Sequence, residues 1–184
     1  MLRMERIAIA VSLTAIAGCQ DAVSPTATNL ATSAVRESAR PAADVRIQDA
    51  CDPATFAVVP GGCQRSGGMT LDQFTAILTK LQRVPAWQFA PADLYIQQGD
   101  AFHATNFGGE NHTFTEVDEF GGGIVPGLNE LAGLTTVAPE CETLAQTDFI
   151  APGQSTPLDE PEEVGDEHYQ CCIHPWMRMT VHIR

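Results

Sequence analysis

The amino-acid sequence predicts an all-β domain preceded by a short helical extension. After Pro85 the chain runs in short apolar stretches separated by turn-forming residues, which is typical of a domain built from β-strands. Before Pro85, one stretch repeats its apolar residues every three or four positions, as an amphipathic helix does. The 184 residues suffice for one core of about 100 to 150 residues plus appendages.

Residues 1–18 have the three parts of a secretory signal peptide. A basic start precedes the apolar run 7–17, which is too short to span a bilayer comfortably. The sequence Ile16-Ala17-Gly18-Cys19 resembles the lipobox of bacterial lipoproteins. This resemblance implies that Cys19 is lipidated and that the protein is exported, facing the periplasm or the extracellular side, with the lipid as its only membrane contact. The alternative is an ordinary secretory signal followed by an unmodified cysteine.

A tether and a helical extension are predicted before the main domain. Residues 19–50 are rich in Ala, Ser and Thr and contain few large apolar residues, which predicts a disordered tether. Residues 51–85 form the extension, whose helix starts with a capping box of Thr70 and Gln73 and ends before Pro85. The helix face expected to pack on the domain consists of Leu71, Phe74, Ile77, Leu78 and Leu81.

Five stretches within residues 86–184 predict strands: 87–89, 93–96, 101–107, 112–117 and 179–183. In the third, alternation places Phe102, Ala104 and Asn106 on one face. The segment 118–157 is longer than a hairpin connection needs and includes a short helix at 128–134. We expect this segment to cover one end of the domain and to be attached covalently through Cys141.

A cluster of soft metal ligands lies near the end of the chain. Within seven residues the sequence offers the thiol of Cys171, the imidazole of His174 and the thioether of Met177. Together with one more imidazole, these groups make up the ligand set of a blue-copper site. His112 is a candidate for the missing imidazole because it lies where a loop enters a strand.

Two motifs, far apart and in this order, resemble those of the cupredoxins, the plastocyanin and amicyanin family of copper proteins. The first is the turn Gly99-Asp100, a strand reaching Asn106, and then His112-Thr113-Phe114-Thr115; the second is Tyr169, Cys171, His174 and Met177 in their spacing. The resemblance covers residues 86–184 and implies a Greek-key β-sandwich with one type 1 copper, bound by His112, Cys171, His174 and Met177. It also implies a carrier of single electrons, not an enzyme, that serves redox partners such as a cytochrome or a respiratory oxidase.

Some of these assignments have alternatives. If Cys172 replaced Cys171 as the thiolate, only one residue would separate it from His174, which is too short for the family's pattern. Met179 is a rival to Met177 as the axial ligand. A copper carrier or buffering protein without a fixed redox partner would use the same ligands. A structural zinc site is disfavoured because such sites rarely use methionine.

The chain has six cysteines, and an exported protein can keep disulfides. If one carries the lipid and one of the final pair binds the metal, four remain, and four allow three connectivities. Cys51 and Cys63 enclose a short loop with Pro and Gly and form the expected local bridge. Cys141 would then pair with Cys172. Neighbouring strand residues point to opposite faces, so Cys171 and Cys172 should have different functions; the alternative is a vicinal disulfide that abolishes the metal site.

The formal net charge of −13 argues against nucleic-acid binding, which needs a positive surface. The acidic run at 159–167 is either a solvated loop or a surface that steers a basic redox partner. His103, His168 and His182 are expected at structural or surface positions. The sequence has no His-x-His pair, no Cys-x-x-Cys-His motif and no evident pairing of nucleophile and base, which speaks against an enzyme.

Overall fold

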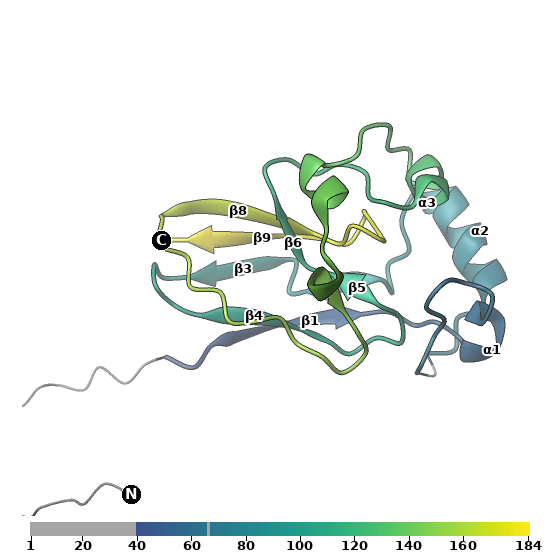
Figure 1. Cartoon of the computed structure of the whole chain (residues 1–184), viewed down its shortest axis with the longest axis horizontal. Helices are drawn as coiled ribbons and strands as arrows, with labels where there is room; N and C mark the ends of the chain where they lie inside the picture. The colour runs from purple at the N-terminus through teal and green to yellow at the C-terminus, as the bar shows by residue number, and fades with distance from the viewer. Residues whose placement is uncertain (1–39, 66) are drawn as a thin grey trace, which may run out of the picture. The chain divides into compact units, whose positions relative to one another are not determined.

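Two β-sheets pack face to face in the structure, a computed structural model that describes residues 40–65 and 67–184 (Figure 1). The first sheet has the order β2-β1-β4 and consists of β1 (Ala43–Gln48), β2 (Gln88–Ala90) and β4 (Phe102–Asn106). The second has the order β3-β9-β8-β6 and consists of β3 (Asp93–Ile96), β6 (Thr115–Val117), β8 (Gly165–Gln170) and β9 (Arg178–Ile183). A two-stranded ladder joins β5 (His112–Thr113) to β7 (Phe149–Ile150). The predicted β-sandwich is confirmed.

One apolar core lies between the two main sheets. From β4, Phe102, Ala104 and Asn106 point inward, which is the face predicted from their alternation. From β9 on the opposite sheet, Val181 and Ile183 point toward them and are fully buried. Each large apolar side chain removed from water in this way contributes about 1.5 to 3 kcal/mol.

The predicted tether at 19–50 is wrong in its last part, because residues 43–48 form β1. This strand lies in the middle of its sheet, parallel to β4 and antiparallel to β2, and it buries Val45 and Ile47 completely. Residues 43–48 alternate apolar and polar side chains, which is a strand signal, but this short run follows a long stretch of small and polar residues and was assigned to the tether with it. The partner strands that stabilise β1 come from residues 40 or more positions later. The predicted signal peptide, the lipidation site Cys19 and the tether up to residue 39 lie outside the described residues.

The predicted helix is confirmed as α2 (Leu71–Leu81), with the expected capping box. The Gln73 backbone N–H donates to the Thr70 side-chain oxygen at 3.3 Å, and the Thr70 N–H donates to Gln73 Oε1 at 3.0 Å. Phe74 and Leu78 pack into the same core cluster as the strands, so the extension and the sandwich share one core. A second, short helix, α1 (Pro53–Phe56), adds Phe56 to this cluster. Among the described residues, no helix is both long and apolar enough to cross a bilayer.

The segment 118–157 folds into short elements, of which the helix lies beside α2 (Figure 1). Its helix, α3 (Pro126–Leu131), begins two residues before the expected start at 128, because Pro126 occupies the first helical turn, and ends three residues before the expected end at 134. Two 3-10 helices follow at Pro139–Thr143 and Gln146–Asp148, and then comes β7. β7 pairs with β5, so the predicted strand 112–117 is divided into β5 and β6.

Replacing Ile47 by alanine tests the corrected role of β1. We expect Ile47→Ala to lower the free energy of unfolding by about 2 to 5 kcal/mol, because it leaves a cavity in the core. Asp44→Asn, at an exposed position of the same strand, should change stability by less than about 0.5 kcal/mol. Urea unfolding followed by circular dichroism measures both. Equal, small effects of the two variants would contradict the assignment of β1 to the core.

Candidate metal centre

Three of the four predicted copper ligands meet in one buried cluster. His112 comes from β5, Cys171 directly follows β8, and His174 lies in the loop that leads to β9. Their ligand atoms all lie within 4.8 Å of one another. Cys171 Sγ is 3.7 Å from His112 Nδ1 and 3.9 Å from His174 Nδ1. His112 and Cys171 are fully buried and His174 is 3% exposed.

These distances fit a first-row metal ion bound between the three atoms. A metal–sulfur bond of about 2.3 Å and a metal–nitrogen bond of about 2.0 Å, at a trigonal angle of about 120°, place sulfur and nitrogen about 3.7 Å apart. The two sulfur–nitrogen distances are within 0.2 Å of this value. A trigonal set of one thiolate and two imidazoles is the arrangement that selects copper in blue-copper sites. The donor set therefore fits copper.

Two backbone hydrogen bonds close the loop that carries the later ligands. The Cys171 N–H donates to the Met177 carbonyl at 3.0 Å, and the Met177 N–H donates to the His174 carbonyl at 2.9 Å. Met177 is 1% exposed and lies within this closed loop. Met179, its rival, belongs to β9, where it pairs with Tyr169 of β8. Two residues of a strand span about 6.6 Å, so Met179 starts from a backbone position further from the loop than that of Met177.

The sulfur of Cys171 accepts hydrogen bonds from two backbone amides, those of Thr113 at 3.4 Å and His174 at 3.5 Å. Burial alone would raise the pKa of the Cys171 thiol, but hydrogen bonds and charge interactions with His112 and His174 outweigh it and hold the pKa well below its usual range. The thiolate form, which is the one that binds metal, is therefore favoured. The Thr113 hydroxyl also accepts from the Cys172 N–H at 2.8 Å and so ties the two ligand loops together.

The carboxylate of Asp49 is hydrogen-bonded to Nε2 of His112, the ring nitrogen that faces away from Cys171. Asp49 lies in the segment predicted to be a tether. Its carboxylate is 1% exposed and lies 2.9 Å from His112 Nε2. The same carboxylate accepts the backbone N–H groups of Gly109 and Glu110 at 2.8 and 3.0 Å. Burial would raise the pKa of Asp49, but these hydrogen bonds lower it to about 2. Burial would lower the pKa of His112, but hydrogen bonds with Asp49 and Cys171 raise it to about 9.

Two glycines allow this close approach of backbone to carboxylate. A Cβ atom on Gly108 would lie 2.0 Å from Asp49 Oδ2, and one on Gly109 would lie 2.6 Å from the sulfur of Cys51. Any larger residue would displace the carboxylate or the disulfide. The Gly108-Gly109 pair was the local sequence signal for a close backbone contact, but nothing in the sequence identified the contact as Asp49.

Glu110 is the second carboxylate beside an expected ligand. The Trp87 indole N–H donates to Glu110 Oε2 at 2.7 Å, and His174 Nε2 lies 3.7 Å from the same oxygen. The side chain of Glu110 is 7% exposed, and burial raises its pKa. Both imidazoles therefore present Nδ1 to the thiolate and Nε2 to a buried carboxylate. Neither Glu110 nor Trp87 belongs to a sequence motif that indicated a role in the site.

The expected disulfide pairs are present, and they separate the functions of the two adjacent cysteines. Cys51 bonds to Cys63, and Cys141 bonds to Cys172 across 31 positions of sequence. Within the described part of the chain, Cys171 alone is a free thiol. The Cys172 carbonyl also accepts the N–H of Ile124 at 2.7 Å, so the segment 118–157 contacts the ligand loop through both a covalent and a hydrogen bond.

The other histidines lie apart from the cluster. His182, on β9, is partnered by the carboxylates of Asp166 and Asp93 at 2.9 and 3.3 Å. His103, on β4, is 3.5 Å from Asp44. Part of the acidic run predicted as a loop is strand: Asp166 and Glu167 belong to β8.

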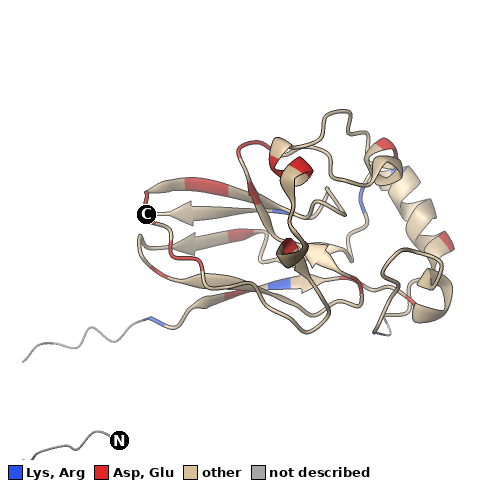
Figure 2. Ribbon diagram, viewed as in Figure 1, with Lys and Arg blue, Asp and Glu red and all other residues tan. Residues whose placement is uncertain are grey.

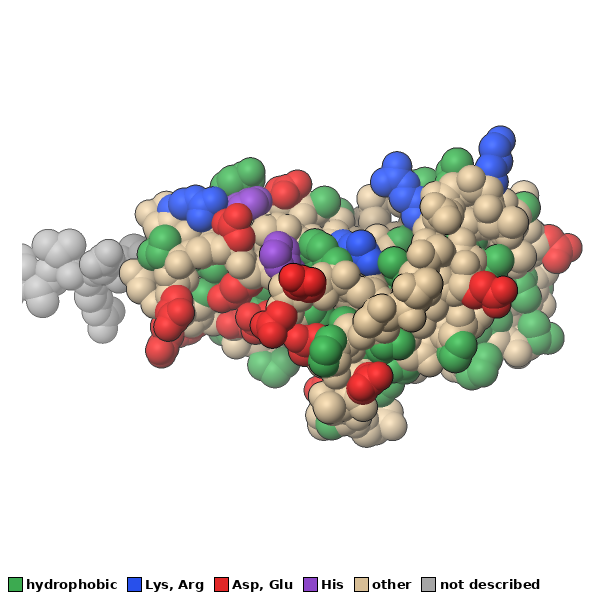
Figure 3. Space-filling model, turned by 90° about the horizontal axis from the view of Figure 1, so that it is seen from above, with side chains coloured by type: hydrophobic (Ala, Val, Ile, Leu, Met, Phe, Trp, Pro, Cys, Tyr) green, Lys and Arg blue, Asp and Glu red, His purple; other side chains and the backbone are tan. Residues whose placement is uncertain are grey.

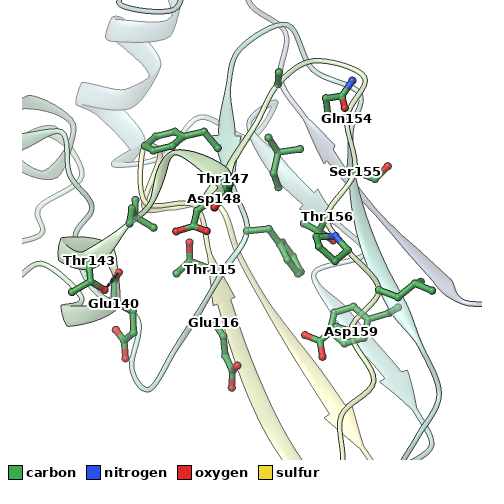
Figure 4. Close-up of a pocket in the computed structure, with 18 residues that line it drawn as sticks. Thr115, Glu116, Glu140, Thr143, Thr147, Asp148, Gln154, Ser155, Thr156 and Asp159 are labelled. Carbon is green, nitrogen blue, oxygen red and sulfur yellow. Dashed lines mark hydrogen bonds between the residues drawn. The ribbon is translucent and has the colours of Figure 1, made fainter. Parts of the chain in front are cut away.

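Two cavities lie near the ligand loops. One of about 480 Å³ reaches His174 and is mainly apolar, lined among others by Phe56, Leu71, Phe74, Ile124, Leu128 and Ile173. The other, of about 650 Å³, lies between β6 and the segment 147–159, and none of the four predicted ligands lines it (Figure 4). Its walls combine aromatic rings with the carboxylates of Glu116, Glu140, Asp148 and Asp159.

No family model and no curated protein sequence matches the chain. Among solved structures, a purple cupredoxin from Nitrosopumilus maritimus is 17% identical, with a TM-score of 0.44, and the match covers 77% of this chain and 99% of that one. Oxidized plastocyanin from Dryopteris crassirhizoma is 14% identical, with a TM-score of 0.40, over 77% of this chain and 100% of that one. A reduced amicyanin mutant is 20% identical, with a TM-score of 0.33, over 50% of this chain and 70% of that one. These structural neighbours are cupredoxins.

The lowered pKa of Asp49 predicts a specific acid dependence of the metal-free protein. A carboxyl with a pKa near 2 in the folded state and 3.8 in the unfolded state contributes stability above about pH 4 and loses it as the pH falls to about 2. The stability difference between the native protein and Asp49→Asn should therefore shrink over this range. Urea unfolding of both proteins from pH 6 to pH 2.5 measures it. A difference that stays constant would contradict the ionised, hydrogen-bonded state of Asp49.

Proposed function

We propose that this protein is a type 1 copper protein that carries single electrons between extracytoplasmic redox partners. The observation that carries the proposal is the buried cluster in which the Nδ1 atoms of His112 and His174 both face the sulfur of Cys171. Met177 would complete the site as the weak axial ligand. Bound copper would supply a one-electron couple, and the chain itself would act as a carrier rather than as an enzyme.

The ligand residues suit a carrier because they hold one geometry for both oxidation states. The thiolate of Cys171 favours Cu(I) and the two imidazoles favour Cu(II), so one arrangement serves both states tolerably. Hydrogen bonds from two backbone amides fix the sulfur, and the closed loop from Cys171 to Met177 fixes His174. Little has to move when an electron arrives, which favours fast transfer.

Burial of the ligands favours electron transfer over copper delivery. A carrier or buffering protein must release its ion to another ligand, which requires that an incoming group reach the metal. The three clustered side chains are at most 4% exposed. Exchange of the ion would therefore require local opening of the structure.

The expected location and partner agree with features of the described chain. Two disulfides suit an oxidising, extracytoplasmic compartment, and we propose that the lipid on Cys19 anchors the protein there. Acidic residues outnumber basic ones on the ribbon and gather on the face that carries β8 (Figures 2 and 3). Such a surface favours a basic redox protein, such as a cytochrome or a respiratory oxidase, over nucleic acid.

Copper loading of cysteine variants tests the proposed function. The native protein with Cu(II) should show an intense visible band from thiolate-to-copper charge transfer, and Cys171→Ser should abolish it. The control is the double variant Cys141→Ser with Cys172→Ser, which removes the neighbouring disulfide and should retain the band. A native protein without the band would refute a type 1 site. A band that survives in Cys171→Ser would show that the ligand register is wrong.

Matched methionine variants distinguish the two axial candidates. Met177→Leu should keep the visible band and raise the reduction potential, because Cu(II) loses a donor and gains a more apolar neighbour. Met179→Leu should leave the potential nearly unchanged, and both changes conserve side-chain volume, which limits the loss of stability to less than about 1.5 kcal/mol. Protein-film voltammetry measures the potentials. A raised reduction potential in Met179→Leu together with an unchanged one in Met177→Leu would assign the axial position to Met179.

A further inference from the structure

We propose that Asp49 and Glu110 are positioning residues that hold both imidazole ligands by their outer nitrogens and lower the reduction potential of the site. This inference rests on the proposed copper-binding function and adds what sets the site's preference between Cu(II) and Cu(I). Neither residue contacts the position between the three ligand atoms. Both act through a histidine.

Asp49 fixes the ring of His112 and the proton on its outer nitrogen. The ring's Nδ1 faces the thiolate at 3.7 Å, so the hydrogen bond at Nε2, 2.9 Å from Asp49, requires the proton to be on Nε2 when Nδ1 binds the metal. The carboxylate itself cannot rotate freely, because the backbone amides of Gly109 and Glu110 donate hydrogen bonds to it and the backbone of Gly108 packs closely against it. A hydrogen bond from imidazole to a carboxylate makes the imidazole a stronger donor to the metal.

Glu110 does the same for His174 at a longer distance. The 3.7 Å between His174 Nε2 and Glu110 Oε2 is longer than a hydrogen bond, so the carboxylate acts on this imidazole through its charge rather than by accepting its proton. The Trp87 indole N–H, 2.7 Å from the same oxygen, holds this carboxylate in place. We therefore expect Glu110 to have the same effect as Asp49 and a smaller one.

The sum of the charges gives the direction of the effect. With a thiolate and two buried carboxylates, the site carries about one net negative charge with Cu(II) and about two with Cu(I). Adding an electron to an already negative, poorly solvated site is unfavourable. Among the described residues, no Lys or Arg forms an ion pair with Asp49 or Glu110; their partners are the imidazoles of His112 and His174, which are neutral when Nδ1 binds a metal. The carboxylates therefore stabilise Cu(II) relative to Cu(I).

Charge-neutralising variants test this inference. In Asp49→Asn we expect Cu(II) affinity to fall by about 10- to 100-fold, the usual effect of losing such a partner. The fold-change in Cu(I) affinity should be about 10 times smaller than the fold-change in Cu(II) affinity. This difference corresponds to a rise in reduction potential of about 59 mV. Glu110→Gln should shift the potential in the same direction by less. Chelator competition with Cu(I) and Cu(II) measures the affinities, and voltammetry measures the potential.

The matched control is Asp44→Asn, which removes the same charge from an exposed position on β1. It should change neither the affinity ratio nor the potential. If Asp49→Asn does not fold in the metal-free state, as judged by circular dichroism, Glu110→Gln carries the test. Potentials equal to that of the control in every folded variant would overturn the inference while the proposed function stands. Absence of the thiolate band in the native protein would overturn both.

Discussion

The buried carboxylate of Asp49 joins the first strand of the sandwich to the candidate metal centre. Asp49 follows β1 directly, and it accepts the N–H groups of Gly109 and Glu110 together with the Nε2 of His112. A carboxylate out of contact with water is strongly destabilising unless such donors surround it. β1, the glycine loop and His112 therefore have to adopt their positions together, and the orientation of the first imidazole is set by a strand more than 60 residues away.

The adjacent residues Cys171 and Cys172 have different bonding partners. Cys171 points its sulfur at the two imidazoles, whereas Cys172 is bonded to Cys141 of the segment 118–157. A disulfide that closes a loop of 31 residues stabilises a fold by roughly 3 to 4 kcal/mol in the chain-entropy account. Gly123 approaches the Cys172 carbonyl so closely that a Cβ atom would lie 2.0 Å from it. The long segment thus supports the loop from outside, and this support contributes to the rigidity that the proposed electron transfer requires.

Local signals predicted much of this structure, and non-local contacts account for most of what was missed. The capping box of α2, the alternation in β4 and the spacing of Cys171 and His174 all lie within a few residues of sequence, and each was found at its predicted place. β1 was missed because its alternation is short and follows a long stretch of small and polar residues, and Asp49 and Glu110 were missed because acidic residues in polar stretches are normally solvated. Only the fold shows that both carboxylates are buried beside histidines.

We expect one thiolate and two imidazoles to bind copper in a single buried site. X-ray absorption at the copper edge, recorded on the loaded full-length protein in both oxidation states, can establish these ligands. One short copper–sulfur bond and two copper–nitrogen bonds should be present, with lengths that change little between Cu(II) and Cu(I). A copper environment of nitrogen and oxygen alone, or one that rearranges on reduction, would rule out this site.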